Sequence, residues 1–245
     1  MNIWQAEGRK WKAGVKTISR LLLQAGVNIR DHVRYTTIIY DCDGVMFDSF
    51  EANLAFYNRI MITLDRPVLD RNNEEQMRVL HTYANRDVLA WFFPDGVEFA
   101  AAVRAASAID YRELVPFMRL EEGFIETLEA LKSRVNLAVC TNRSTSMDMV
   151  LESFGLTSYF GCVMTASRVA SPKPHPEPLL KVLEHYRISP AEALFVGDSD
   201  VDRQAAAAAG VPFVAYKSDL AALARINAHG EILGLLGLPA RQGSD

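Results

Sequence analysis

The stretch Ile38-Ile39-Tyr40-Asp41-Cys42-Asp43-Gly44-Val45-Met46-Phe47-Asp48-Ser49 determines how the rest of the chain is interpreted. An apolar run from Tyr35 to Tyr40 predicts a buried strand. Asp41 and Asp43 follow it and point to the same side of an extended chain, and Gly44 lets the chain turn away sharply. Active sites of open α/β sheets lie at the carboxyl ends of strands, so we expect both carboxylates in such a crevice.

The two acids also limit the chemistry of that crevice. Two close carboxylates repel each other, so both stay ionised only with a cation between them or with a shared proton. For this stretch alone, an Asp-Gly turn with solvated acids is the alternative interpretation, and the rest of the chain has to decide between the two.

The composition is that of an ordinary globular protein. The 245 residues are 49% hydrophobic and 23% charged, and a net charge of −4 gives no nucleic-acid signature. Three cysteines without metal-ligand spacing favour a reducing cytoplasm over a disulfide scaffold. No apolar run approaches the roughly 18 residues that a membrane span needs, and a signal-peptide core is lacking. We therefore expect a cytoplasmic protein that binds neither nucleic acid nor membrane.

Residues 1–34 differ from the rest of the chain in charge. Their net charge is +5, because basic side chains outnumber acidic ones, whereas the net charge of the remainder is −9. Apolar positions from about Lys12 to Gln24 predict an amphipathic helix. We expect a basic helical N-terminal extension that packs on the domain or on a neighbouring subunit. Attraction to anions or to a membrane surface, and a transit peptide, are the alternatives.

The remaining chain predicts an α/β fold. Residues 49–118 carry helical patterns and no strand pattern. After them, apolar runs such as Val135–Cys140, Ala193–Val196 and Val211–Tyr216 alternate with helical segments, which favours a parallel sheet. We predict a Rossmann-like parallel sheet core, formed by residues 35–48 and 119–245, with an inserted all-helical cap domain over residues 49–118.

Further polar groups follow the later strands. Thr141 and Asn142 come directly after one strand and before a helix, where a hydroxyl and an amide suit phosphate oxygens, although helix capping is an equal alternative. Lys173 lies between two prolines, which stiffen the loop that holds it. Asp198 and Asp202 follow the next strand, and clustered carboxylates there suit Mg²⁺ or the N-terminus of a helix.

In this order, the motifs resemble those of the haloacid dehalogenase-like hydrolase superfamily. The matching residues are Asp41-Cys42-Asp43-Gly44-Val45, then Thr141-Asn142, Lys173, and Gly197-Asp198-Ser199 with Asp202. The resemblance covers about Tyr35 to Leu236 and is strongest to phosphoglycolate phosphatase-type members, which carry a helical cap.

The resemblance implies a Mg²⁺-dependent phosphatase for a small phosphorylated metabolite that is phosphoglycolate-like or sugar-phosphate-like. Asp41 would attack phosphorus to form an aspartyl-phosphate. Asp43 would protonate the leaving alcohol and then activate water, which requires it to be protonated part of the time. Thr141 and Asn142 would hold the transferring phosphoryl group, and Lys173 would neutralise Asp41 and the phosphate oxygens.

The resemblance also implies a metal site. Mg²⁺ would lie between the Asp41 carboxylate, the backbone carbonyl of Asp43, Asp198 and a phosphate oxygen. Asp202 would orient either the metal-bound waters or Lys173, and Gly44 would support the turn of the loop.

Two other functions remain open at this point. A sugar-phosphate mutase of the same fold needs the same core residues. A non-catalytic regulatory protein could use residues 1–34 to dock a partner. We expect a monomer or a homodimer.

Selectivity for the leaving group should lie in the cap, because the core motifs bind only phosphoryl and metal. Asn85 and Arg86 stand at a polar break between two predicted helices. We expect them to contact an anionic or hydroxylated leaving group. The alternative is that Asn85 caps the second helix and Arg86 is solvated.

Overall fold

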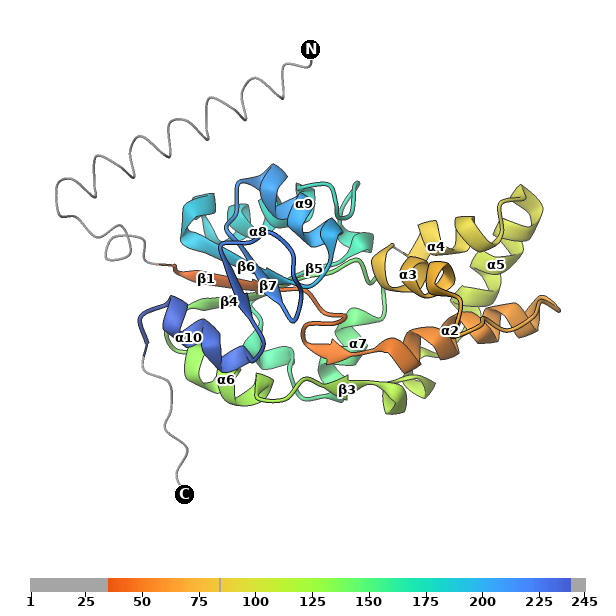
Figure 1. Cartoon of the computed structure of the whole chain (residues 1–245), viewed down its shortest axis with the longest axis horizontal. Coiled ribbons are helices and arrows are strands. Elements are labelled where there is room, and N and C mark those ends of the chain that lie inside the picture. The colour runs from red at the N-terminus through yellow and green to blue at the C-terminus, as the bar shows by residue number, and fades with distance from the viewer. Residues whose placement is uncertain (1–34, 84, 239–245) are drawn as a thin grey trace, which may run out of the picture. The chain divides into compact units, whose positions relative to one another are not determined.

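The computed structural model of the chain describes residues 35–83 and 85–238, so the predicted N-terminal extension lies outside the described residues. The described part contains a six-stranded parallel sheet with the strand order β5-β4-β1-β6-β7-β8 (Figure 1). The strands are β1 (Thr37–Tyr40), β4 (Asn136–Cys140), β5 (Cys162–Met164), β6 (Ala193–Gly197), β7 (Phe213–Tyr216) and β8 (Ala224–Ile226). Together with the inserted helices described below, this sheet confirms the predicted fold class.

Strand β1 lies between β4 and β6 because its residues suit burial on both faces. Ile39 is in register with Ala138 of β4 and Phe195 of β6. Ile38 and Tyr40 contribute to one hydrophobic cluster and Ile39 to the other. Such an unbroken apolar run is typical of a parallel strand that is covered on both sides.

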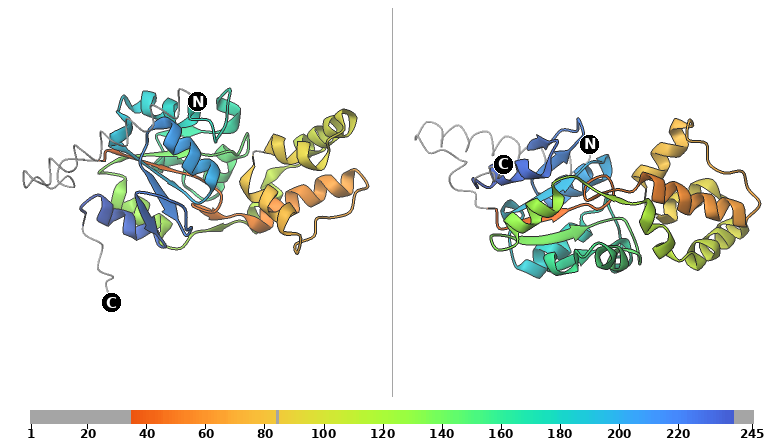
Figure 2. Two further views of the ribbon diagram at one scale, coloured as in Figure 1. Left: turned by 45° about the horizontal axis from the view of Figure 1, so that its top comes forward. Right: turned by 90° about the horizontal axis from the view of Figure 1, so that it is seen from below.

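Helices cover the two faces of this sheet (Figures 1 and 2). Buried side chains of α6 (Phe124–Leu131), α7 (Met147–Ser153) and α10 (Ile232–Leu235) join the cluster that contains Ile38 and Tyr40. Those of α8 (Glu177–Tyr186) and α9 (Asp200–Ala209) join the cluster that contains Ile39. Short 3₁₀ helices complete the connections at Tyr111–Glu113, Val115–Phe117, Thr157–Tyr159, Ala166–Arg168, Pro190–Glu192 and His229–Glu231.

An all-helical segment is inserted between β2 (Phe47–Asp48) and β3 (Arg119–Leu120), which pair as an antiparallel ribbon. Its helices are α2 (Phe50–Thr63), α3 (Glu74–Thr82), α4 (Asn85–Phe92) and α5 (Gly96–Ala108). The ribbon brings both ends of this insertion next to the loop that follows Asp43. The domain limits given above for core and cap stay predictions.

Three strands of the structure carry no usable sequence signal. The ribbon strands β2 and β3 have two residues each, which is too short for a periodic pattern. Strand β8 has three residues with an exposed arginine at its centre, so it lacks the apolar run of a buried strand. Strand β7 begins at Phe213 rather than at Val211. Pro212 directly precedes it and lacks the N–H that a ladder requires.

Two neighbouring leucines on α8 test the packing of this helix. Leu179 is fully buried in the cluster under the sheet, whereas Leu180 is 46% exposed. We expect Leu179→Ala to lower the free energy of unfolding by about 2–5 kcal/mol, because it leaves a cavity. Leu180→Ala, the matched control, should cost less than about 1 kcal/mol. Equal losses in urea unfolding would contradict the placement of α8.

Candidate functional site

The loop after β1 carries the two acids and depends on one glycine. The backbone N–H of Asp41 donates to the carbonyl of Val196 at 2.9 Å, which extends the pairing of β1 with β6. Gly44 has a φ of +76°, and a Cβ there would lie 2.1 Å from the Oδ2 atom of Asp198. The glycine is therefore required twice, for its left-handed conformation and for the close approach of the Asp198 carboxylate.

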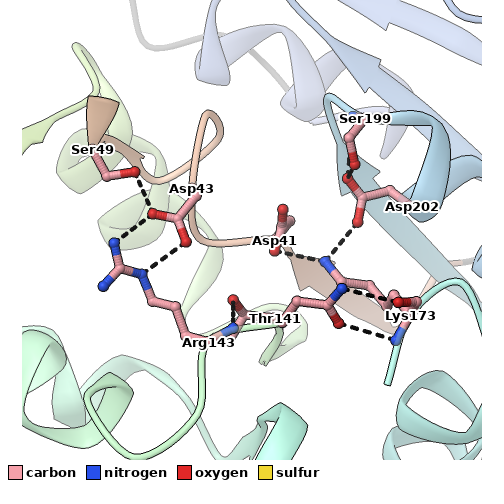
Figure 3. Close-up of polar contacts among 9 residues, drawn as sticks. Asp41, Asp43, Ser49, Thr141, Arg143, Lys173, Ser199 and Asp202 are labelled. Atoms are coloured by element: carbon pink, nitrogen blue, oxygen red, sulfur yellow. Dashed lines mark hydrogen bonds and ion pairs between the residues drawn. The ribbon is translucent and has the colours of Figure 1, made fainter. Parts of the chain in front are cut away.

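Lys173 joins two of the strand-end acids. Its side chain is almost completely buried, and Nζ donates to Oδ1 of Asp41 at 2.7 Å and to Oδ1 of Asp202 at 2.6 Å (Figure 3). The other oxygen of the Asp202 carboxylate accepts from the backbone N–H of Ser199 at 3.1 Å and from its hydroxyl at 2.5 Å. Of the two roles predicted for Asp202, the structure therefore favours the orientation of Lys173.

Asn142 holds the loop that presents Lys173. Its Nδ2 donates to the backbone carbonyl of Lys173 at 2.9 Å, and its Oδ1 accepts from the backbone N–H of Lys173 at 3.0 Å. Sequence reasoning assigned Asn142 only to the phosphoryl group. This two-point contact with a residue 31 positions away is a tertiary feature that its position after β4 does not reveal.

The electrostatics of the site leave an excess of negative charge. Ligand atoms of Asp41, Asp198 and Asp202 lie within 4.8 Å of one another. Burial and the neighbouring Asp202 raise the pKa of Asp41 despite the contact with Lys173, and the same two causes raise the pKa of Asp198 to about 7. Burial alone would lower the pKa of Lys173, but Asp202 and Asp41 raise it above its ordinary value. One ammonium group thus faces three carboxylates.

Arg143 is the site residue that sequence reasoning missed. Its guanidinium is buried and contacts Asp43 at two points, with Nε 2.8 Å from Oδ2 and Nη2 2.5 Å from Oδ1 (Figure 3). The hydroxyl of Ser49 also donates to Oδ1 of Asp43. A signal was present, because Arg143 stands two residues after Thr141 and so falls on the same side of an extended chain end.

This ion pair fixes the charge of Asp43. Burial would raise the pKa of Asp43, but the Arg143 guanidinium holds it below its usual value. In this arrangement Asp43 is a carboxylate, which suits a proton acceptor. The expected role as a proton donor to the leaving group would need the protonated form.

A cavity of about 230 Å³ lies between these residues and the helical insertion. Asp41, Asp43, Thr141, Asn142, Arg143 and Lys173 line it from the sheet side. From the insertion it is lined by Asn53, Phe56, Tyr57, Leu80, Tyr83, Asn85, Ala106, Ser107, Ile109 and Tyr111. Among the described lining residues, the insertion contributes hydroxyl, amide and apolar groups but no charge.

The two predicted cap residues have different positions. Asn85 lines the cavity, where its Oδ1 accepts from the hydroxyl of Tyr57 at 3.1 Å. Arg86 is exposed and does not line the cavity, and its guanidinium lies over the ring of Phe99 at 5.2 Å from the centroid. The next residue of a helix points about 100° away, so Arg86 faces α5. The structure does not support the predicted contact of Arg86 with a leaving group.

Comparison with known proteins defines the family. The model of the haloacid dehalogenase-like hydrolase family matches residues 38–216. The solved structure of a subfamily IA hydrolase of this superfamily, from Geobacter sulfurreducens, is 70% identical to this chain in sequence. The two structures align with a TM-score of 0.69 over 82% of this chain and 96% of that one. CbbY from Rhodobacter sphaeroides, solved with phosphate, shares the fold with a TM-score of 0.71 at 21% identity, covering 83% of this chain and 100% of that one.

A curated relative is similar over a shorter stretch. Phosphoglycolate phosphatase of Escherichia coli K12 is 44% identical over 91 residues, which are 36% of this chain and 36% of that protein. The chain belongs to the haloacid dehalogenase-like hydrolase family. None of the described helices is long and apolar enough to cross a membrane.

Glu177 allows a test of the loop that carries Lys173. Its carboxylate accepts from the backbone N–H groups of Ala170 at 3.0 Å and Ser171 at 2.8 Å, and these bonds lower its pKa from 4.5 to about 2. When the pKa of an acid is lower in the folded state than in the unfolded state, its ionised form stabilises the fold at pH values above the unfolded-state pKa. This stabilisation is lost as the pH falls through the folded-state pKa. We therefore expect Glu177→Gln to be less stable than the original protein at pH 7.

The difference in stability should shrink between about pH 4.5 and pH 2. Urea unfolding of both proteins across this range measures it. Glu184→Gln, on an exposed position of the same helix, corrects for the loss of one negative charge. A stability difference that is the same at pH 7 and at pH 3 would show that the charge of Glu177 does not hold the loop.

Proposed function

We propose that the chain is a Mg²⁺-dependent phosphatase that hydrolyses a small phosphate monoester through an aspartyl-phosphate on Asp41. The observation that carries this proposal is the position of Asp41. Its carboxylate stands at the carboxyl end of the central strand, with Oδ1 held by Lys173, and it lines the cavity. An anchored carboxylate at the wall of a cavity is well placed as a nucleophile toward phosphorus.

The surrounding groups suit phosphoryl transfer, in which catalysis depends on positioning and on neutralising charge. Lys173 would balance negative charge on the transferring group. Thr141 and Asn142 line the same wall of the cavity and would contact its oxygens. Asp43 would accept the proton of the attacking water, since Arg143 keeps it in the carboxylate form.

The acidic cluster fits a magnesium ion. Mg²⁺ takes oxygen ligands and uses one or two protein carboxylates. Asp41 and Asp198 would hold it, together with the backbone carbonyl of Asp43, whereas Asp202 is occupied by Lys173 and Ser199. When bound, the ion would supply Lewis-acid stabilisation of the phosphoryl oxygens. Its positive charge would also offset the excess of carboxylates, since burial and the neighbouring Asp202 raise the pKa values of Asp41 and Asp198.

The leaving group is proposed to be small and hydroxylated or singly charged. The cavity measures about 230 Å³, and the insertion offers it hydroxyl and amide groups such as those of Tyr57 and Asn85. The similarity to Escherichia coli phosphoglycolate phosphatase makes phosphoglycolate the first substrate to test. Simple sugar phosphates are the next.

A screen of phosphorylated metabolites with release of free phosphate as readout tests the proposal. We expect Mg²⁺-dependent release, which chelation by EDTA removes. A mutase would instead return a phosphorylated isomer without free phosphate. Absence of phosphate release from every ester, generic ones included, would refute phosphatase function.

Asp41→Asn should lower kcat by on the order of a thousandfold or more, because an amide cannot form the covalent intermediate. Asp148→Asn is the control for the substitution itself, since Asp148 is exposed and paired with Arg168 outside the cavity lining. Circular dichroism checks that both variants fold. Substantial Mg²⁺-dependent turnover by folded Asp41→Asn would exclude Asp41 as the nucleophile.

A further inference from the structure

The contacts of Arg143 reach from the sheet to the helical insertion. Besides its two contacts with Asp43, its Nη1 donates to the hydroxyl of Tyr111 at 2.5 Å. Tyr111 belongs to the short 3₁₀ helix near the end of the insertion. Its ring also lies under the guanidinium, 5.0 Å from the centroid, and packs against Phe56 of α2. Arg143 therefore joins Asp43 to Tyr111 near the end of the insertion, and the ring of Tyr111 continues this chain of contacts to α2.

The geometry of the pair fixes the orientation of the Asp43 carboxylate. A guanidinium that meets a carboxylate at two points aligns the two planar groups, which a lysine cannot do. The side chain of Arg143 is 6% exposed, so it has little access to water as an alternative partner. The two Asp43 contacts and the Tyr111 contact use all three nitrogens of the guanidinium.

We propose that Arg143 is a positioning residue that orients the Asp43 carboxylate toward the attacking water, and that Tyr111 holds Arg143 in place from the insertion. This inference rests on the proposed phosphatase function. In the step concerned, the oxygen of water forms a bond to phosphorus while the bond between phosphorus and the Asp41 oxygen breaks. The electron pair of that bond returns to Asp41, the water proton passes to Asp43, and inorganic phosphate is released.

The step predicts a particular kinetic signature with p-nitrophenyl phosphate, whose leaving group needs no proton. In Arg143→Met, hydrolysis of the phosphoenzyme should slow, so kcat falls by about tenfold or more. The value of kcat/KM, which reports on formation of the phosphoenzyme, should fall much less, so KM falls as well. Acid quenching at steady state should trap more phosphoenzyme than in the original protein. Arg143→Lys keeps the charge but should not restore kcat, because it cannot hold both carboxylate oxygens.

Tyr111→Phe provides a milder variant that keeps the ring and its packing, in case Arg143→Met does not fold. It should lower kcat and KM together, by a smaller factor. In the Arg143→Met background it should have no further effect, because the two residues act in one chain of contacts. Tyr57→Phe is the matched control, since it removes a hydroxyl from the same cavity wall. The hydroxyl of Tyr57 donates to Asn85 and not to Arg143. Its effect should add to that of Arg143→Met.

The outcomes separate this inference from the function on which it rests. If the original protein releases no phosphate and forms no phosphoenzyme, the proposed function itself fails. If it does both, but Arg143→Met lowers kcat and kcat/KM equally or raises KM, Arg143 serves substrate binding or the first transfer and the inference is wrong. Independent, additive effects of Tyr111→Phe and Arg143→Met would refute the link through Tyr111.

Discussion

The site depends on one buried ammonium group, that of Lys173, between the carboxylates of Asp41 and Asp202. A buried charge without a partner is strongly destabilising, whereas a well-bonded pair can persist. The contact joins the end of β1 to the loop before α8 and to α9. Asn142 holds the backbone of Lys173, Ser199 holds the carboxylate of Asp202, and the backbone N–H of Asp41 donates to Val196. Each member of the ion triplet therefore has a further contact that fixes it.

A second ion pair, between Arg143 and Asp43, gives Asp43 a different environment from that of Asp41. Lys173 leaves Asp41 facing the cavity within a cluster that has excess negative charge, which suits its proposed role as a metal-assisted nucleophile. Arg143 instead contacts both carboxylate oxygens of Asp43 and lowers its pKa, which keeps it ionised. Two carboxylates one residue apart thus receive different environments from two different cations. The second of these cations, Arg143, also contacts the helical insertion through the hydroxyl of Tyr111.

The sequence predicts those features that depend on local patterns of apolar and charged residues. The apolar run before Asp41, the alternation of later strands with helices, and polar residues at strand ends were sufficient for the fold class. What stayed hidden depends on pairing between distant segments. The two-point contact of Arg143 with Asp43 arises only once β4 lies beside β1. That of Asn142 with Lys173 arises only once the loop after β5 lies beside the end of β4. Arg86 lies outside the cavity lining, which the sequence could not predict because a break between helices does not reveal which face of α4 meets the cavity.

The proposed chemistry requires that a phosphoryl group passes to Asp41. This transfer can be followed in a single-turnover reaction with an accepted phosphate ester, quenched in acid and analysed by peptide mass spectrometry. We expect a phosphoryl group on the peptide that spans residues 35–48, and fragmentation should place it on Asp41. Phosphate release with that peptide unmodified throughout, or a phosphoryl group on any other residue, would exclude Asp41 as the phosphoryl acceptor.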